Sequence, residues 1–344
     1  MNILLVKLSS LGDVLHNLPV VWDIRAQYPD AHIAWAVEEG YVHLLEPLKS
    51  TPELRGIDEV IPVCLRRAKK DLFRGRVKKA IAAFIKMKKA LRSKHWHVIV
   101  ETQGLIKSAL IASLAKQSMV TTSVYGIGNQ TQYSGYEPMA RFFYDQSIQV
   151  PFQLHAVDRS RAILASSLQA AWPSRDIAPP QFYPSEYLTQ LRRQTNPLGF
   201  VANQYVMCFH ATARIAKAWN EAAWVAIAQY LVSQGLTPVF PWGNAAEKVV
   251  SERLVAQVPG ANLPPAFTIA QAATLVAQAR LTIGVDTGLT HYSAVLNLPT
   301  IELYIDSPRW KTEGYWSTQV INLGDMRTPP TVDEVLLAVQ QLLA

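Results

Sequence analysis

The chain has 344 residues, 49% of them hydrophobic and 17% charged, a balance that excludes a disordered protein and indicates a packed one. Its length exceeds what a single core usually holds, so we expect two domains. The net charge of +7 arises in one segment, because residues 66–94 hold 13 Lys or Arg against a single acid, Asp71. Such a segment indicates an anionic partner: nucleic acid, an anionic membrane surface, or a phosphorylated or carboxylated substrate.

The N-terminus and the cysteines indicate a cytoplasmic protein. Lys7 interrupts the first apolar run, which lacks a small-residue cleavage site, and no run of about 18 apolar residues occurs in the chain. We therefore expect neither a signal peptide nor a membrane span. The only cysteines, Cys64 and Cys208, lie far apart without metal-ligand spacing, which fits two buried thiols in a reducing compartment.

The first predicted element is a buried strand at residues 2–8, which a Ser-Ser-Leu-Gly-Asp turn ends. A helix with apolar residues at helical spacing follows to about residue 26. Pro19 lies early in it, where proline destabilises a helix least. Asp13 therefore lies at the carboxyl end of the first strand, the edge at which ligands bind in open α/β sheets. Its carboxylate has two interpretations: a cap on the helix, or a general base facing the cleft.

Alternating strands and helices continue to residue 168. Within the basic segment, Ile81, Phe84, Ile85 and Leu91 recur at helical spacing, with basic residues on the remaining faces, and predict an amphipathic basic helix. A solvated helix face usually explains such a stretch, but residues 66–70 directly follow a strand, and on a strand-end loop they would face the cleft. The other expected elements are strands at residues 33–37, 57–63, 98–100 and 123–126, and a helix at residues 155–168.

Residues 171–187 contain four prolines without periodicity and predict a linker between domains at residues 1–170 and 188–344. Beyond it, Thr331 with Glu334 three residues on forms a capping box for a last helix, residues 331–343, which is a candidate to pack back on the first domain. The second domain's remaining elements are strands at residues 205–209, 237–240, 281–285 and 300–305, and helices at residues 220–234, 267–280 and 289–298.

The sequence Val-Asp-Thr-Gly-Leu-Thr-His at residues 285–291 joins a buried strand to a helix. The first N–H groups of that helix have no intrahelical partner and carry the positive end of the dipole, so a phosphate is the natural occupant. The hydroxyls of Thr287 and Thr290 add donors, and Asp286 lies where a carboxylate holds sugar hydroxyls. The alternative is a capped helix without a ligand. The Asp-Thr-Gly triplet of aspartic proteases is excluded, because those are β-sheet proteins.

Several enzyme classes are disfavoured by missing motifs. The dinucleotide fingerprint is absent after both leading strands, Gly126-Ile127-Gly128 is followed by Thr131 where a third glycine would be needed, and no Gly-Lys-Ser/Thr phosphate loop occurs. A nicotinamide dehydrogenase or a kinase is therefore not expected. Without a His/Cys/Asp cluster at metal spacing, charge on a leaving diphosphate falls to Lys217, hydroxyls and helix N-termini, as in a metal-independent transferase.

A set of short motifs then occurs in order along nearly the whole chain, and it resembles the lipopolysaccharide heptosyltransferases. Each motif alone is weak, but the ordered set is specific. The motifs are Lys7-x-Ser9-Ser10-x-Gly12-Asp13, Val37-Glu38-Glu39-Gly40, Arg66-Arg67-x-Lys69-Lys70, Thr102-Gln103-Gly104-Leu105, His155-Ala156-Val157-Asp158-Arg159, His210-Ala211-Thr212, Pro241-Trp242-Gly243 and Val285-Asp286-Thr287-Gly288-Leu289-Thr290-His291.

The resemblance implies an α/β GT-B fold, in which two Rossmann-like domains face each other across a cleft. It implies inverting transfer of L-glycero-D-manno-heptose from ADP-heptose to a Kdo residue of Kdo-lipid A, in inner-core lipopolysaccharide biosynthesis. The donor needs no further cofactor, with assistance by a divalent ion left undecided. The implied location is peripheral, on the anionic cytoplasmic face of the bacterial inner membrane, and the implied state is a monomer without nucleic acid.

The resemblance also assigns roles to residues, with Asp13 as the base that deprotonates the Kdo hydroxyl. In the donor half, Glu247 would hold the ribose, Phe267 would lie by the adenine and Asp286 would bind the heptose hydroxyls. The residues implied to hold the diphosphate are Thr212, Lys217, Thr287, Gly288 and His291. The residues implied to bind the acceptor are Ser9, Ser10, Glu39, Arg66, Arg67, Lys69, Lys70, Gln103 and Lys107, and no metal ligand is implied.

Three positions depart from the family pattern. Ala213 replaces a second threonine, which removes one phosphate hydrogen bond, and Tyr136 stands where an arginine would contact the acceptor. Phe267 replaces a methionine and reshapes an apolar wall.

Two rival functions remain. A heptosyltransferase that adds a later core heptose is the nearer one, although the basic acceptor cluster favours the Kdo-rich first acceptor. The more remote one is a non-enzymatic module that binds an anion or nucleic acid through the basic helix. The basic segment contains only two aromatic residues, Phe73 and Phe84, so stacking platforms for bases are missing.

Overall fold

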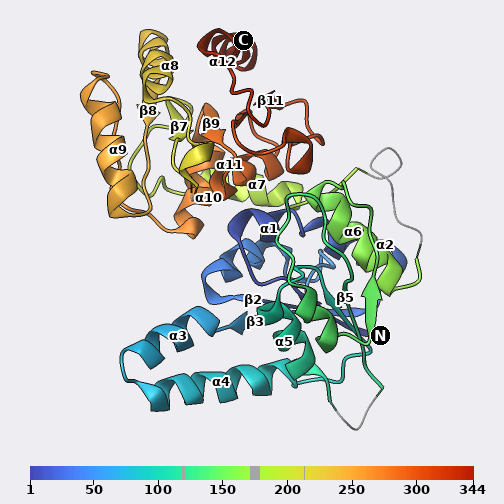
Figure 1. Cartoon of the computed structure of the whole chain (residues 1–344). Helices are drawn as coiled ribbons and strands as arrows, with labels where there is room; N and C mark the ends of the chain where they lie inside the picture. Colours follow the sequence, from blue (N-terminus) through green and yellow to red (C-terminus); the bar gives the residue numbers. More distant parts are fainter. Residues whose placement is uncertain (118–120, 171–178, 213) are drawn as a thin grey trace. The chain divides into compact units, whose positions relative to one another are not determined.

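The computed structural model describes residues 1–117, 121–170, 179–212 and 214–344. The chain divides into two compact units, Met1–Gln181 and Phe182–Ala344, each built around one parallel sheet (Figure 1). Of the predicted linker, residues 171–178 lie outside the described residues. Its last residues are not a linker, because Phe182 packs against Trp316 with ring centroids 4.5 Å apart and a helix, α7, begins at Ser185.

The first unit holds a six-stranded parallel sheet in the order β3-β2-β1-β4-β5-β6. The strand order reverses between β1 and β4, which makes the carboxyl ends of these two strands the switch point where open α/β sheets bind ligands. The strands predicted for this unit are all present. They were recognisable in the sequence because buried parallel strands are continuous apolar runs. The strands are β1 (Asn2–Val6), β2 (His32–Glu38), β3 (Glu59–Val63), β4 (Val98–Glu101), β5 (Ser123–Ile127) and the unpredicted β6 (Gln146–Ile148).

The helix predicted to run to about residue 26 is two helices. Proline has no N–H to donate into a continuing helix, so Pro19 occupies the first turn of a new helix rather than the interior of the old one. The helices of this unit are α1 (Leu11–Leu15), α2 (Pro19–Gln27), α3 (Leu65–Phe73), α4 (Val77–Leu91), α5 (Ile106–Ala115) and α6 (Ala156–Ser167), with 3₁₀ turns η1 (Glu39–Leu44), η2 (Glu46–Leu48) and η3 (Pro138–Phe143).

The basic segment also differs from its prediction. Residues 66–70 are not a loop: they belong to α3, whose first turn is closed by the Ala68 N–H donating to the Cys64 carbonyl at 2.8 Å. The amphipathic helix α4 is confirmed, but only Leu91 of its predicted apolar face is buried in the core, whereas Ile81, Phe84 and Ile85 are exposed.

The second unit has a five-stranded parallel sheet in the order β11-β10-β9-β7-β8, whose order reverses between β7 and β9. Its strands are β7 (Tyr205–Phe209), β8 (Thr237–Val239), β9 (Leu281–Val285), β10 (Thr300–Tyr304) and the unpredicted β11 (Val320–Gly324). Its helices are α7 (Ser185–Arg193), α8 (Glu221–Ser233), α9 (Ala245–Ala256), α10 (Ile269–Gln278), α11 (Gly288–Val295) and α12 (Val332–Leu343), with 3₁₀ turns η4 (Ile215–Lys217) and η5 (Arg309–Lys311).

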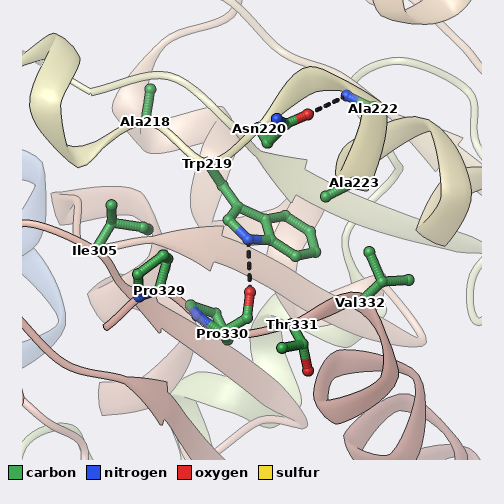
Figure 2. Close-up of a pocket in the computed structure, with 10 residues that line it drawn as sticks. All are labelled: Ala218, Trp219, Asn220, Ala222, Ala223, Ile305, Pro329, Pro330, Thr331 and Val332. Carbon is green, nitrogen blue, oxygen red and sulfur yellow. Dashed lines mark hydrogen bonds between the residues drawn. The ribbon is translucent and has the colours of Figure 1, made fainter. Parts of the chain in front are cut away.

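Side-chain caps explain where two of these helices begin. The Asn220 side chain accepts from the Ala222 N–H at 2.7 Å at the start of α8 (Figure 2). The predicted capping box of α12 is confirmed, since Thr331 and Glu334 satisfy each other's backbone N–H groups at 2.7 and 3.3 Å.

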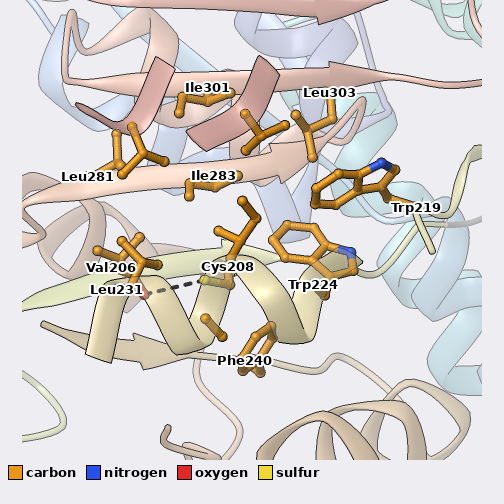
Figure 3. Packing of buried hydrophobic residues seen from close by; sticks show 14 of the residues in the cluster. Val206, Cys208, Trp219, Trp224, Leu231, Phe240, Leu281, Ile283, Ile301 and Leu303 are labelled. Carbon is orange, nitrogen blue, oxygen red and sulfur yellow. Dashed lines mark hydrogen bonds between the residues drawn. The ribbon is translucent and has the colours of Figure 1, made fainter. Parts of the chain in front are cut away.

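The core of the second unit lies between its sheet and helices α8 and α12. Figure 3 shows the part of it in which Trp219, Trp224 and Leu231 pack with residues of the strands. Trp219 and Trp224 meet edge to face with ring centroids 5.4 Å apart and pack among the aliphatic strand residues. Val335 and Val339 of α12 are fully buried in the same cluster, so the last helix packs on its own unit. No helix within the described ranges is both long and apolar enough to cross a bilayer.

Candidate active site

In the first unit, Asp13 lies in the first turn of α1, directly after β1. Its Oδ2 accepts from the Ser10 backbone N–H at 2.9 Å and from the Ser10 hydroxyl at 2.7 Å, which completes a capping box. The capping interpretation of Asp13 is therefore confirmed. A cap and a base are not exclusive, because the second carboxylate oxygen takes no part in these two hydrogen bonds.

Two buried cations act electrostatically on this carboxylate. Lys7, which extends β1, donates from Nζ to the Thr102 carbonyl at 2.9 Å, and Arg159 of α6 donates to the Thr131 hydroxyl at 3.1 Å. Burial alone would raise the pKa of Asp13, but the charge of Lys7, the Ser10 hydrogen bonds and the charge of Arg159 outweigh it and lower the pKa. Asp13 is thus held ionised, the state that a proton acceptor requires.

Sequence reasoning gave no role to Lys7 or Arg159. Lys7 could have been recognised as a candidate because it is a lysine at the end of an otherwise apolar strand, and a charge is buried only where other groups compensate it.

Gln103 joins the ends of the two strands at which the first sheet reverses its order. Its side-chain oxygen accepts from the Leu8 N–H at 2.9 Å and the Ser9 N–H at 3.4 Å. Lys107 of α5 donates to the Ser9 hydroxyl at 3.0 Å. The structure therefore gathers Ser9, Gln103 and Lys107, three of the residues predicted to bind the acceptor, around the turn that carries Asp13.

A second group of predicted acceptor residues lies where β2 and β3 end. The Arg67 guanidinium pairs with the Glu39 carboxylate at 2.8 Å, and the Arg66 guanidinium lies 5.4 Å from the centre of the Tyr41 ring. Lys69 lies 5.8 Å from the ring centre of Phe73, and Lys70 is exposed. Arg67 and Glu39 are both half exposed or nearly so, so this pair contributes little to stability and is available to a ligand.

In the second unit, Lys217 follows β7 and Asp286 follows β9, the strands between which the second sheet reverses. The Lys217 ammonium contacts Asp286 Oδ2 directly. The Nε2 atom of His291 contacts the other oxygen, Oδ1, at 2.9 Å, and the Thr312 hydroxyl reaches Oδ1 at 3.3 Å. Burial would raise the pKa of Asp286, but the hydrogen bond and charge of His291 and the charge of Lys217 hold it well below its ordinary value.

His291 is buried between two carboxylates. Its Nδ1 lies 2.7 Å from Glu302 Oε1, and Glu302 also accepts from the Tyr304 hydroxyl at 2.9 Å and the Gly314 N–H at 3.1 Å. Burial opposes the imidazolium, but the charge of Glu302 and the bonds to both carboxylates raise the pKa of His291 to about 10. With both ring nitrogens occupied, His291 orients Asp286 rather than offering a free donor.

The N-terminus of α11 keeps donors available beside this network. Thr287 makes no side-chain cap, and no described residue accepts from the N–H groups of Thr287 or Gly288. The prediction that the Thr290 hydroxyl donates to a ligand is wrong, because this hydroxyl is buried and donates to the Val285 carbonyl at 2.8 Å. Gly284 permits that packing: a Cβ there would lie 2.1 Å from the Thr290 hydroxyl oxygen.

Thr212 and Glu247 line one pocket of about 360 Å³ in the second unit, together with His210 and Trp224. The Glu247 carboxylate accepts from the Gly243 N–H at 2.7 Å and the Asn244 side chain at 2.7 Å, which holds it at the start of α9. Phe267 is half-buried just before α10 and does not line this pocket. The structure thus brings together two of the residues predicted to bind the donor, in a pocket that Ile215 and Ala218, close to Lys217 in the sequence, also line.

A larger pocket of about 720 Å³ lies between the start of α8 and the start of α12 (Figure 2). Its lining is mainly apolar, and the indole N–H of Trp219 already donates to the Pro330 carbonyl at 3.0 Å. None of the predicted site residues lines it.

Of the three departures from the family pattern, Ala213 lies outside the described residues. Tyr136 donates from its hydroxyl to the Gly128 carbonyl at 3.0 Å, a contact within the first unit. In the parts of the chain that the structure describes, no three His, Cys, Asp or Glu side chains are grouped to hold a metal ion.

Residues 84–337 match glycosyltransferase family 9 (heptosyltransferase). The chain belongs to this family. It is 31% identical over 323 residues to lipopolysaccharide heptosyltransferase 1 of Escherichia coli K12, covering 93% of each protein. It is 31% identical over 321 residues to lipopolysaccharide heptosyltransferase 1 of Pseudomonas aeruginosa, covering 93% of this chain and 83% of that protein.

Solved structures agree with this family 9 assignment. The E. coli heptosyltransferase WaaC with ADP superimposes with a TM-score of 0.79 at 27% identity, covering 99% of this chain and all of the other. The fold class is therefore GT-B, with two Rossmann-like units, as predicted. The chain is a glycosyltransferase of the heptosyltransferase family, and the non-enzymatic binding module is excluded as its primary role.

Proposed function

We propose that this heptosyltransferase transfers L-glycero-D-manno-heptose from ADP-heptose to a Kdo residue of Kdo-lipid A, with inversion at the anomeric carbon. The observation that carries the proposal is the pair of charged networks, one at the switch point of each sheet. Asp13, flanked by Lys7 and Arg159, provides an ionised base. Lys217 and Asp286 provide a cation and a carboxylate beside an uncapped helix N-terminus, which suits a sugar diphosphate.

The second unit is proposed to bind the donor. The N–H groups at the start of α11 and the Lys217 ammonium would meet the diphosphate, where negative charge grows as ADP leaves. Asp286 would accept hydrogen bonds from heptose hydroxyls, held in place by His291 and Glu302. Glu247 would hold the ribose and Thr212 a phosphate oxygen, while Phe267 would lie by the adenine.

The first unit is proposed to bind the acceptor. Asp13 would take the proton from a Kdo hydroxyl as its oxygen attacks the anomeric carbon of the heptose. The bond from that carbon to the phosphate oxygen breaks in the same displacement, and ADP carries away the electron pair. Because the attack comes from the face opposite the leaving ADP, this single displacement inverts the configuration of the anomeric carbon. Ser9, Ser10, Gln103 and Lys107 would position the acceptor around Asp13.

The basic residues suit an acceptor rich in anions. Arg66 and Arg67, with Lys69 and Lys70, would pair with Kdo carboxylates and lipid A phosphates, which guanidinium groups bind with two parallel hydrogen bonds. Glu39, now paired with Arg67, would release it to the acceptor. The lysines of α4 would attract the enzyme to the anionic cytoplasmic face of the inner membrane. We propose that it acts there as a peripheral monomer.

The first heptose of the inner core is the proposed addition. Relatives named heptosyltransferase 1 at 31% identity support it, and so does the high local density of positive charge near the acceptor residues. The rival assignment is a later core heptose.

The direct test uses a deacylated, water-soluble Kdo-lipid A acceptor with ADP-heptose. We expect ADP release together with a product heavier by one heptose, whose new linkage has the opposite anomeric configuration to the donor. ADP release without an adduct, or retention of configuration, contradicts the proposal.

A further inference from the structure

Helices α3 and α4 form a hairpin, residues 65–91, that stands off the first unit's sheet (Figure 1). The hairpin is attached mainly at one end. Met87 and Leu91 near the end of α4 pack into the core with Ala34, Ile61 and Trp96, whereas no residue of α3 is buried. Most of the hairpin surface is therefore available to a partner.

That surface exposes large apolar side chains. Phe73, at the turn between the helices, is 81% exposed, and Ile85 is 60% exposed. Soluble surfaces rarely gather such side chains without a function. The exposed apolar residues of the hairpin are Leu72, Phe73, Val77, Ile81, Phe84 and Ile85.

The apolar side chains and the cations are arranged around each other. Val77, Ile81 and Ile85 are spaced by four residues, so they form one stripe along α4. Lys78 and Lys89 lie directly beside this stripe on the surface of the helix, and both are exposed. Long lysine stems permit the ammonium groups to stay at a polar surface while neighbouring apolar side chains go deeper.

The charge decides between partners. Residues 66–94 carry 13 Lys or Arg and one acid, Asp71, which lies 3.8 Å from Arg76. A second copy of this chain would bring the same positive charge against it, so self-association through the hairpin is disfavoured. Nucleic acid would use stacking on aromatic rings, but four of the six exposed side chains are aliphatic. An anionic bilayer accommodates both the charge and the aliphatic groups.

We propose that the α3–α4 hairpin inserts Phe73, Ile81 and Ile85 into the headgroup and acyl boundary of an anionic bilayer. The inference rests on the proposed function for the membrane-linked acceptor, and it changes the mode of attachment from surface attraction to insertion. Attachment by lysines alone would vanish at high salt, because screening removes it. Insertion of apolar side chains leaves a component of binding that salt does not remove.

The test measures binding to vesicles of phosphatidylcholine with phosphatidylglycerol, in low salt and in roughly 0.5 M NaCl. We expect wild type to retain measurable binding at high salt. A triple variant, Phe73→Ser, Ile81→Ser and Ile85→Ser, should lose most of that residual binding while keeping all its basic residues. The matched control is Leu337→Ser, since Leu337 is 66% exposed on α12 of the other unit. Equal high-salt binding by wild type and triple variant overturns the proposal.

Depth is measured with a polarity-sensitive dye on a Phe73→Cys variant, because both native cysteines are buried. The emission should shift to shorter wavelength with anionic vesicles and be quenched by brominated acyl chains, whereas a dye on Leu337→Cys should not respond. An unresponsive dye at position 73 also overturns insertion. Heptose transfer to the soluble acceptor is assayed separately, so failure of insertion is distinguishable from failure of the proposed reaction.

Discussion

The Lys217 ammonium contacts the Asp286 carboxylate, and this ion pair joins the loops after β7 and β9 at the point where the second sheet reverses its strand order. Both side chains are mostly buried, so the pair is shielded from solvent more than a surface salt bridge is. A diphosphate arriving at α11 would compete with Asp286 for the ammonium. In the proposed function, this pair would hold Lys217 ready for a leaving group that gains charge.

Replacing Lys217 with Ala should raise the KM for ADP-heptose and also lower kcat, because the lost cation acts on both bound and leaving diphosphate. We expect the loss to be the same for every acceptor tested. Steady-state kinetics with two acceptors measure this. If only the acceptor KM changes, Lys217 does not serve the donor.

Replacing Asp13 with Asn should lower kcat by roughly 10²–10⁴ and leave ADP binding nearly unchanged, as expected for loss of a general base. Ser10→Ala is the comparison variant, because it removes the hydroxyl that bonds Asp13 Oδ2 but keeps the carboxylate. Since Ser10 is also proposed to position the acceptor, its kcat is compared at saturating acceptor. That change should cost about 0.5–2 kcal/mol of stability, the range for a lost cap, with a much smaller effect on kcat. Equal kinetic losses in the two variants would reduce Asp13 to a structural cap.

Much of the fold was predictable because buried parallel strands are continuous apolar runs, as in residues 281–285 and 205–209. The α3–α4 hairpin was less predictable. The apolar stripe at Ile81 and Ile85 predicts an amphipathic helix, but it does not show whether the rest of the chain buries the apolar face. In the structure that face is exposed. In the site, the motifs pointed to Asp13 and Asp286, whereas Glu302 was missed because it reads as one residue of a strand. Its signal was an acid within an otherwise apolar strand.

The acid limb of kcat/KM should move to higher pH when Lys7 is replaced by Met. Lys7 lowers the pKa of Asp13, so its removal raises that pKa, and the base is then protonated and inactive at pH values where wild type still works. Lys116→Gln is the control, because Lys116 pairs with Asp145 elsewhere in the same unit. A pH profile of Lys7→Met that matches wild type would show that Lys7 does not act on the proposed base, Asp13.

His291 should make thermal stability depend on alkaline pH. Its folded pKa is raised to about 10, above the ordinary value of 6.5, so its charged form stabilises the folded state. That stabilisation is fully present below about pH 6.5 and is lost as pH rises through about 10. The difference in thermal unfolding midpoint between wild type and His291→Gln should therefore shrink as the pH rises from about 6.5 to about 10. A constant difference across that range would contradict the charged state of His291.

Neutralising Arg66, Arg67, Lys69 and Lys70 together should raise the acceptor KM for a soluble, deacylated acceptor. Neutralising Lys78, Lys86 and Lys89 on α4 should weaken low-salt vesicle binding and leave that KM unchanged, because their proposed partner is the membrane. Acceptor kinetics and vesicle binding are measured on both variants. Indistinguishable profiles would remove the division between acceptor binding by α3 and membrane attraction by α4.

A paired acceptor assay distinguishes transfer of the first heptose from transfer of a later one. Purified enzyme with ADP-heptose is given Kdo-lipid A without heptose, or the same acceptor already carrying one heptose, and the products are weighed by mass spectrometry. We predict addition of one heptose to the heptose-free acceptor and no addition to the other. Turnover on the heptose-bearing acceptor alone would contradict transfer of the first heptose and assign the enzyme to a later step.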